Sequence, residues 1–494
     1  MVQIDSNRKE SDCVTNKDLI KQNLENYFGY TSFREGQEEA VLAALEGKDT
    51  LIMLPTGTGK SICYQLTGYC LDGLVIIVSP LLSLMQDQVE QLKLNGEKRV
   101  AAINSLMNVR EKDWVLKHLS DYKFIFLSPE MLRQEYVITS LKKVPICLFA
   151  IDEAHCISQW GLDFRPDYLD LGLIRQQLNF PLTMALTATA TQRVREEILT
   201  SLQINNEKTK QIIYSVDRSN IAFYAQICDH NKNEELLKQV QRLKKPGIIY
   251  FSSKKTADET AELIRQETTI TAESYHSDIE AEDKIKIQQQ FIYDEIDIIC
   301  ATSAFGMGIN KSNIRFVIHY HLPGSPEAYL QEVGRCGRDG KPSLALLLYE
   351  KGDSIIQFRL QESSLPTIDM LEYSYRKGKV LEGSCSPVQK VLIENYLNAN
   401  IPIEAAKSQV KSREVSKQQQ LYYMIDYAET ASCKRAFLLH YFDERLEHKP
   451  SQCCSSCHLE LADFYEKNDL KQKKESEPEK NWEEILKELF LIGN

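Results

Sequence analysis

Short apolar runs rich in β-branched residues recur along the chain, and a segment of helical character follows each of them. The clearest are Leu51–Leu54, Leu74–Val78, Phe124–Leu127, Cys147–Ile151, Ile248–Phe251, Ile296–Cys300 and Phe316–His319. Such runs are typical of parallel strands that are buried beneath helices on both faces of a sheet. One sheet rarely accommodates so many strands, and the polar stretch Asn205–Lys210 separates two groups of them. The pattern therefore predicts an α/β chain with two parallel sheets in tandem.

We divide the 494 residues into five parts at the polar breaks. Residues 1–13 form a polar N-terminal extension, and 14–207 and 208–345 are the two predicted α/β domains. Region 346–462 lacks the strand rhythm and is predicted to be helical, and 463–494 joins a charged linker to a short helix. One apolar stripe on that helix is formed by Trp482, Ile485, Leu486, Leu489 and Phe490. We expect the stripe to pack either on the protein's own surface or on a protein partner.

The composition excludes several classes of protein. Hydrophobic residues make up 43% of the chain, which is normal for a globular protein. The apolar runs are far shorter than the roughly 20 residues that a membrane span requires. The N-terminus is polar, and the 13 cysteines are an odd number in a large chain, which favours a reducing compartment over secretion. We expect a cytoplasmic protein, associated with the nucleoid if it is bacterial, with no membrane partner.

The net charge of −11 bears on nucleic-acid binding. Phosphate backbones select basic surfaces, so an acidic chain argues mildly against a dedicated duplex binder. A protein that grips single strands through backbone amides, hydroxyls and aromatic faces needs few fixed cations. If the chain binds nucleic acid, we expect an affinity with a shallow dependence on salt concentration.

A glycine-rich stretch directly follows the strand Leu51–Leu54, and it reads Pro55-Thr56-Gly57-Thr58-Gly59-Lys60-Ser61. Backbone N–H groups of such a turn can wrap a polyphosphate, while Lys60 supplies a point charge and the Ser61 hydroxyl a ligand for Mg²⁺. The strict G-x-x-x-x-G-K-[ST] pattern is broken because Leu54 replaces its first glycine. A helix cap without a ligand would leave Lys60 and Ser61 unexplained. The predicted nucleotide-binding residues are Thr56, Gly57, Thr58, Gly59, Lys60 and Ser61.

Acidic residues and arginines at two other places suit such a site. Asp152 and Glu153 follow the strand Cys147–Ile151, at the strand end where open parallel sheets bind ligands. Asp152 can hold the hydration shell of Mg²⁺, and Glu153 can orient and deprotonate a water. Arg335 and Arg338 share a face if they are helical, and they can stabilise charge on a γ-phosphate held by the first domain. Each pair alone is more often solvated surface, but together with the glycine-rich loop they predict nucleotide hydrolysis between the domains.

Taken in order, these motifs resemble those of superfamily 2 helicases, and the aromatic-rich stretch after the acids resembles the loop that distinguishes the RecQ family of DNA helicases. The resemblance extends over residues 24–460. It implies two RecA-like domains in tandem, followed by a mainly helical zinc-binding subdomain. It also implies ATP-dependent unwinding of DNA with 3′→5′ polarity and a role in DNA repair and recombination. The implied cofactors are ATP, Mg²⁺ and Zn²⁺, and the implied partners are single-stranded and forked DNA.

Particular residues take roles from this resemblance. Tyr30 is expected to stack on adenine while Arg34 and Gln37 read the base, and Arg338 stands at the arginine-finger position. Ser79 and Gln86 belong to a segment that resembles the DNA-contacting motif Ia. The other residues expected to contact DNA are Lys311, in the segment that resembles motif V, and Gln159, Trp160, Phe164 and Arg165 of the aromatic loop.

The aromatic loop also makes sense physically, because Trp160 and Phe164 offer stacking faces to unpaired bases. The bland alternative is that Trp160, Phe164 and Tyr168 are core aromatics. An interleaved glycine and proline suit an exposed loop better. Leu162 stands where the family has a histidine that is thought to couple DNA binding to hydrolysis. We therefore expect DNA stimulation that is weaker or differently routed.

Four cysteines lie close together near the C-terminus: Cys433, Cys453, Cys454 and Cys457. The last two form a C-x-x-C knuckle, which fits two corners of a tetrahedral Zn²⁺ site, and Cys433 can supply a third. The family pattern has a cysteine where Glu460 stands. The fourth ligand is therefore Cys453, His458 or Glu460, and the alternative to a zinc site is a metal-free cluster of buried thiols.

Two rival functions stay open. One is an RNA helicase of the same superfamily, and the other is a nucleotide-gated zinc protein that binds DNA as an adaptor with little unwinding. The second rival persists because only 37 residues follow Cys457, too few for the winged-helix and C-terminal helical domains that RecQ proteins often carry. Four basic residues either contact duplex phosphates or form a solvated helix face: Lys407, Lys411, Arg413 and Lys417.

Overall fold

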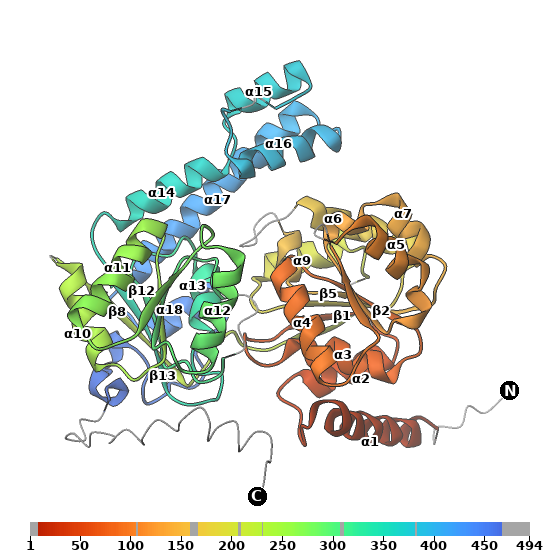
Figure 1. The fold of residues 1–494 in the computed structure, drawn as a ribbon, viewed down its shortest axis with the longest axis horizontal. Coiled ribbons are helices and arrows are strands. Elements are labelled where there is room, and N and C mark those ends of the chain that lie inside the picture. The colour runs from red at the N-terminus through yellow and green to blue at the C-terminus, as the bar shows by residue number, and fades with distance from the viewer. Residues whose placement is uncertain are drawn as a thin grey trace, which may run out of the picture.

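The computed structural model describes residues 8–104, 107–158, 166–205, 209–229, 231–306, 311–380 and 383–466, with side chains from residue 16 onward. Two parallel sheets, each flanked by helices, lie side by side, and a helical arm rises from the second of them (Figure 1). This arrangement confirms the predicted fold class. None of the described helices is long and apolar enough to cross a membrane.

Domain 1 is built on a seven-stranded parallel sheet. Its strand order is β3 (Val100–Ile103), β4 (Phe124–Leu127), β2 (Leu74–Val78), β5 (Ile146–Ile151), β6 (Thr183–Thr187), β1 (Thr50–Met53) and β7 (Lys210–Ile213). One face is covered by α2 (Gln37–Leu45), α3 (Lys60–Cys70) and α4 (Leu82–Leu94). The other face is covered by α5 (Val109–Lys117), α6 (Pro129–Leu132), α7 (Glu135–Leu141), α8 (Leu171–Gln177) and α9 (Gln192–Ser201). The N-terminal helix α1 (Arg8–Phe28) packs against α3. Because β5 and β1 both neighbour β6, the segments that follow these three strands meet at one edge of the sheet.

Domain 2 is built on a six-stranded parallel sheet. Its order is β10 (Ala272–Tyr275), β11 (Ile298–Ala301), β9 (Gly247–Tyr250), β12 (Phe316–His319), β13 (Ser343–Tyr349) and β8 (Ile221–Ile227). Helices α10 (Lys232–Arg242) and α11 (Lys254–Glu267) cover one face. Helices α12 (Ala281–Ile292) and α13 (Pro326–Val333) cover the other, together with helices of the arm.

Three of the predicted boundaries need correction. β7 pairs with β1 in the first sheet, so domain 1 extends past residue 207 and the domains are joined by residues 214–220. β7 is an edge strand in which only Ile212 is buried, so it carries no buried-strand signal. β13 continues beyond residue 345, and α1 begins at Arg8, inside the predicted N-terminal extension.

The arm consists of α14 (Asp353–Ser364), α15 (Ile368–Lys377), α16 (Pro387–Asn398), α17 (Ile403–Glu429) and α18 (Lys434–Tyr441). At its tip, α15, α16 and the first turns of α17 enclose a small core of their own. Most of the basic residues on α17 are engaged within the arm: Arg413 is buried, Lys417 donates to the hydroxyl of Ser364, and Lys407 pairs with Glu372. Lys411 is exposed. The interpretation of these four basic residues as a solvated helix face therefore holds for Lys411 and not for the buried Arg413.

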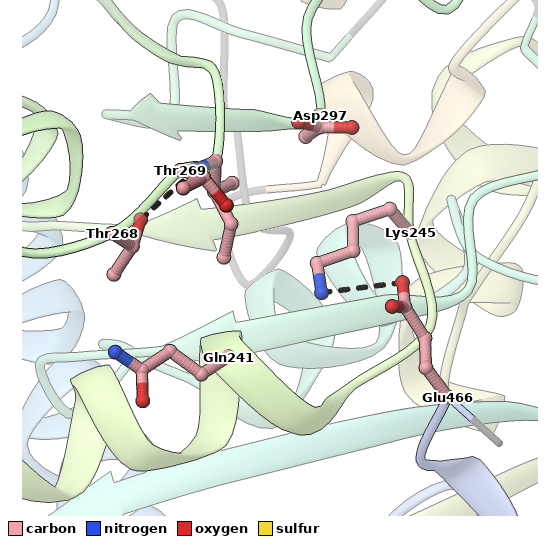
Figure 2. A pocket seen from close by; sticks show the side chains of 7 residues that line it. Gln241, Lys245, Thr268, Thr269, Asp297 and Glu466 are labelled. Atoms are coloured by element: carbon pink, nitrogen blue, oxygen red, sulfur yellow. Dashed lines mark hydrogen bonds and ion pairs between the residues drawn. The ribbon is translucent and has the colours of Figure 1, made fainter. Parts of the chain in front are cut away.

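The chain beyond α18 runs back along domain 2. Cys454 forms a β-bridge with Phe223, and the backbone N–H of Phe223 donates to the carbonyl of Cys453 at 3.1 Å. This knuckle covers part of the exposed edge of β8. Further on, Glu466 forms an ion pair of 3.2 Å with Lys245 beside an open pocket of about 510 Å³ (Figure 2). The predicted helix at Trp482–Phe490 lies outside the described residues.

Candidate functional site

The glycine-rich stretch forms a loop between the carboxyl end of β1 and the first turn of α3. Gly57 and Gly59 both have a φ of 81°, in the left-handed region where a side chain is strained. Lys60 is the first residue of α3, and its ammonium lies 3.2 Å from the carbonyl of Leu54. Partial burial lowers the pKa of Lys60, and the nearby carboxylates of Glu153 and Asp152 oppose that shift. A half-buried cation at a helix N-terminus is suited to an anionic ligand.

The residues predicted to recognise adenine lie directly against this loop. Gln37 is almost fully buried, and its amide donates to the carbonyls of Thr58 and Gly59. Arg34 donates to the carbonyl of Gly57, so both side chains support the loop backbone in this structure. Tyr30 is 50% exposed, which leaves its ring accessible for stacking. The predicted role in reading the base therefore comes with a second one, the bracing of the phosphate loop.

The two predicted acids follow β5 at the same edge of the sheet. The Asp152 carboxylate accepts from the backbone N–H of Glu153 at 3.0 Å, and burial, with the Glu153 charge next, raises the pKa of Asp152 to about 7. Glu153 has a left-handed backbone with a φ of 47°, and its carboxylate lies 3.3 Å from His155 Nδ1. His155 Nδ1 also lies 3.0 Å from the hydroxyl of Thr187, which ends β6. His155 therefore connects Glu153, after β5, with Thr187 at the end of β6.

Of the two predicted arginines of domain 2, Arg338 reaches the phosphate loop, and Arg335 lies close to Arg338. A Cβ added to Gly57 would lie 2.7 Å from Cγ of Arg338, so the Arg338 side chain packs directly over the loop. Burial, followed by the charges of Arg335 and Arg218, lowers the pKa of Arg338 to about 10. Arg335 is buried beside Gly306, and a Cβ there would lie 2.1 Å from its guanidinium carbon. Several cations thus lie at or near the phosphate loop, partly removed from water. A bound polyanion would stabilise this concentration of positive charge.

The four cysteines come together at one point. Their sulfur atoms all lie within 4.8 Å of one another, with 3.6 Å between Cys433 and Cys453 and 3.8 Å between Cys433 and Cys454. Zn–S bonds of about 2.3 Å in a tetrahedron place the sulfurs about 3.8 Å apart, so the group has the size of a Zn²⁺ site. Cys453 completes the set with Cys457, and neither His458 nor Glu460 belongs to it. Of the three alternatives for the fourth ligand, this grouping favours Cys453.

The residues predicted to contact DNA are placed unevenly. Gln86 is exposed on α4, whereas Ser79 is only 2% exposed. Lys311 is buried and its ammonium contacts Asp294 at 2.7 Å, so in this structure it faces the protein rather than a phosphate. Tyr168 is a fully buried core residue whose hydroxyl donates to the carbonyl of Asp152. For this residue the alternative of a core aromatic is therefore confirmed. Gln159, Trp160, Leu162, Phe164 and Arg165 lie outside the described residues.

Some residues of the site escaped the sequence analysis. The amide of Gln65 on α3 donates to the side chain of Gln88 on α4, at 3.2 Å, and so joins the phosphate-loop helix to the motif Ia helix. Arg218 contacts the backbone of the loop that carries Arg335 and Arg338, and Arg435 contacts the carbonyl of Arg218. No local pattern marks these residues, because each acts through a partner far away in the sequence; their only signal is a polar residue within an apolar surrounding.

Comparisons with known proteins identify the family. The model of DEAD/DEAH box helicases matches residues 34–198, that of the helicase conserved C-terminal domain matches 231–340, and that of the RecQ zinc-binding domain matches 390–458. The chain is 42% identical over 491 residues to the probable ATP-dependent DNA helicase RecS of Bacillus subtilis, covering 96% of this chain and 98% of the relative. The chain belongs to the RecQ family of helicases.

Other RecQ-family proteins are longer. The chain is 37% identical to the ATP-dependent DNA helicase RecQ of Haemophilus influenzae, of which it spans 62%, the match covering 88% of this chain. Among solved structures, the helicase MrfA bound to DNA aligns with a TM-score of 0.57 at 16% identity, over 70% of this chain and 53% of that one. That likeness concerns the fold alone. Family membership and the sulfur geometry together make the four-cysteine cluster a Zn²⁺ site.

Proposed function

We propose that this RecQ-family chain is an ATP-dependent DNA helicase that moves 3′→5′ along a single strand and unwinds duplex DNA in repair and recombination. The observation that carries the proposal is the packing of Arg338 from one domain over Gly57 in the phosphate loop of the other. A γ-phosphate bound by that loop would lie between the two domains, so hydrolysis and the relative position of the domains are linked.

Each residue of the site has a defined task in this proposal. Lys60 and the loop amides bind the β- and γ-phosphates, and Ser61 and Asp152 would hold Mg²⁺, whose charge would stabilise the phosphate oxygens. Glu153 orients the attacking water and accepts its proton. Arg335 and Arg338 stabilise the charge that develops on the transferred phosphoryl group.

Two contacts support coupling of this chemistry to DNA. His155 joins Glu153 to Thr187 at the end of β6, and Gln65 joins the phosphate-loop helix to Gln88 on the motif Ia helix. A change at the γ-phosphate therefore reaches α4, on which the predicted DNA contact Gln86 is exposed. Opening and closing of the domains would then shift the strand by one step for each hydrolysis event.

A forked-duplex unwinding assay tests the proposal. We expect strand separation with ATP, none with a non-hydrolysable analogue, and ATP hydrolysis that DNA stimulates more than RNA. Lys60→Ala should abolish both activities while single-strand binding is largely retained, because the DNA contacts lie on other elements. Lys48→Ala is the matched control, since Lys48 is exposed and pairs only with Glu46.

The outcomes separate the rival functions. DNA-stimulated hydrolysis that persists in Lys60→Ala would contradict the proposed site. Stimulation by RNA but not by DNA would identify an RNA helicase, and hydrolysis without strand separation would identify an adaptor. Docking of a protein partner by the C-terminal segment stays a separate prediction, tested by comparing unwinding and partner capture with and without residues 467–494.

A further inference from the structure

The segment that joins the two domains, residues 214–220, lies against the loop of residues 334–338 that carries both site arginines, here called the arginine loop. Arg218, in the joining segment, points its guanidinium at the backbone of the arginine loop. It donates to three carbonyls of this loop, those of Gly334 and Cys336 at 2.9 Å each and that of Gly337. A guanidinium is a rigid planar fork of donors, so three such bonds define the course of the loop backbone.

Arg435 holds the joining segment from the other side. It lies two residues after the zinc ligand Cys433, at the start of α18, and its side chain is completely buried. Its guanidinium donates to the carboxylate of Asp217 and to the carbonyls of Arg218, at 3.2 Å, and Ile221. Arg435 therefore links the end of α18 that carries Cys433 to the Asp217 side chain and to the backbone at Arg218 and Ile221.

Two further contacts fix this arrangement. The carboxylate of Glu444, just beyond α18, accepts from the backbone N–H of Val216 at 3.0 Å and from the hydroxyl of Ser215. Leu439 and Phe442 pack into the core of domain 1, whereas Cys453 and Cys454 pack into that of domain 2. The zinc-binding region thus contacts both domains and the segment between them.

We propose that Arg218 is a positioning residue for ATP hydrolysis, and that Arg435 sets its position from the zinc site. The inference rests on the proposed function and names residues that control its rate. Arg335 and Arg338 stabilise charge only when they stand at the right place, and their place depends on the backbone that Arg218 holds. Loss of Arg218 leaves three carbonyls of the loop without this donor, so the loop relaxes and the arginines move.

The expected signature is a change in rate without a change in binding. In Arg218→Gln, kcat of DNA-stimulated ATP hydrolysis should fall about 100-fold, the cost of a misplacement of about 1 Å. KM and the affinity for a fluorescent ATP analogue should change less than about threefold, because Lys60 and the phosphate loop are intact. Arg218→Lys should be intermediate, since an ammonium cannot reproduce the planar fork.

Arg175→Gln provides the matched control. Arg175 is a buried arginine of domain 1, and it too donates to backbone carbonyls, those of Leu202 and Gln203. It lies away from the arginine loop, so this variant should lower the melting temperature without a selective loss of kcat. Arg435→Lys should retain one Zn²⁺ per chain and lower kcat in the same direction as Arg218→Gln.

A double-mutant cycle with Arg338→Ala decides whether Arg218 acts through the arginine loop. If it does, Arg218→Gln should cost clearly less in kcat when Arg338 is already alanine than in the wild type, because only the displacement of Arg335 then remains. A full additive loss, a rise in KM with kcat unchanged, or an equal selective loss of kcat in Arg175→Gln would overturn the inference. If Arg218→Gln does not fold, Arg218→Lys supplies the same cycle. An inactive wild-type chain would instead contradict the proposed function, so the two failures are distinguishable.

Discussion

Gly334, at the end of α13, stands against Thr56 of the phosphate loop so closely that a Cβ on Gly334 would lie 1.8 Å from Thr56 Oγ1. The two residues come from different domains, and the crevice around them encloses only about 20 Å³. The φ of Gly334 is −60°, which any residue can adopt, so the requirement for glycine comes from the approach of the domains and not from the backbone.

Gly334→Ala should therefore oppose closure of the domains. We expect kcat for ATP to fall at least about tenfold and the affinity for a non-hydrolysable ATP analogue to change little, because Lys60 and the sequence of the phosphate loop are unchanged and the clash with Thr56 is relieved when the domains separate. Steady-state kinetics and equilibrium titration measure the two quantities. Gly324→Ala is the control, since a Cβ there would meet only the side chain of Gln357, at 3.2 Å. An unchanged kcat would show that this contact is not part of the hydrolytic state.

Cys453 is predicted to be the fourth zinc ligand. Cys453→Ser should lower the zinc content below one ion per chain and reduce the melting temperature, because three thiolates bind Zn²⁺ less well and the knuckle loosens on β8. His458→Ala should keep its zinc, and Cys228→Ser, at a buried cysteine in another part of domain 2, is the control for the loss of a thiol. Metal analysis of the purified chains gives the answer; zinc lost in His458→Ala would return that histidine to the ligand set.

A buried ion pair ties the arm to domain 2. Lys232 at the start of α10 and Asp353 at the start of α14 are 2.6 Å apart, with side chains only 5% and 9% exposed. Lys232→Met should lower the free energy of unfolding by about 3 kcal/mol, because the Asp353 carboxylate is left buried without its partner. The double variant Lys232→Met with Asp353→Leu should recover most of that loss.

The control for this pair is the exposed pair Lys117–Asp113 on α5, in which the side chains are 71% and 60% exposed. Lys117→Met should change the free energy of unfolding by less than about 0.5 kcal/mol. Urea denaturation followed by circular dichroism measures all three variants. Equal effects at the buried and exposed pairs would contradict the assignment of this energy to desolvation.

Nucleotide selectivity can separate the predicted role of Gln37 in base reading from its contacts with the phosphate loop. Gln37→Ala should raise KM for ATP at least about tenfold and erase the preference for ATP over GTP, because the amide predicted to read adenine is gone. Its support of Thr58 and Gly59 predicts a further, equal loss for both nucleotides. Measurements of KM for ATP and for GTP with the same variant separate the two effects. If Gln37→Ala still prefers ATP over GTP, only the support of the phosphate loop remains as a role for Gln37. Gln91→Ala, on the motif Ia helix, serves as the matched control.

Much of the site was predictable because its chemistry is local. The loop from Pro55 to Ser61, the acids Asp152 and Glu153, and the pair Arg335 and Arg338 each lie within a few residues of one another. Parallel strands that end at one edge bring such short motifs together in any sheet of this kind. The buried-strand runs likewise predicted two α/β domains, because apolar periodicity reports burial whatever the neighbouring element is.

Only the tertiary structure decided the long-range contacts. Arg435 and Asp217 are 218 residues apart in the chain and yet share a buried ion pair, which no pattern along the sequence can signal. The assignment of β7 to the first sheet, the choice of Cys453 over His458, and the burial of Lys311 against Asp294 depend in the same way on distant partners. By itself the sequence determined which chemical groups are present and which segments are buried. Packing determined their partners, because burial is a property of a segment, whereas a hydrogen bond or a metal site requires a particular geometry between segments.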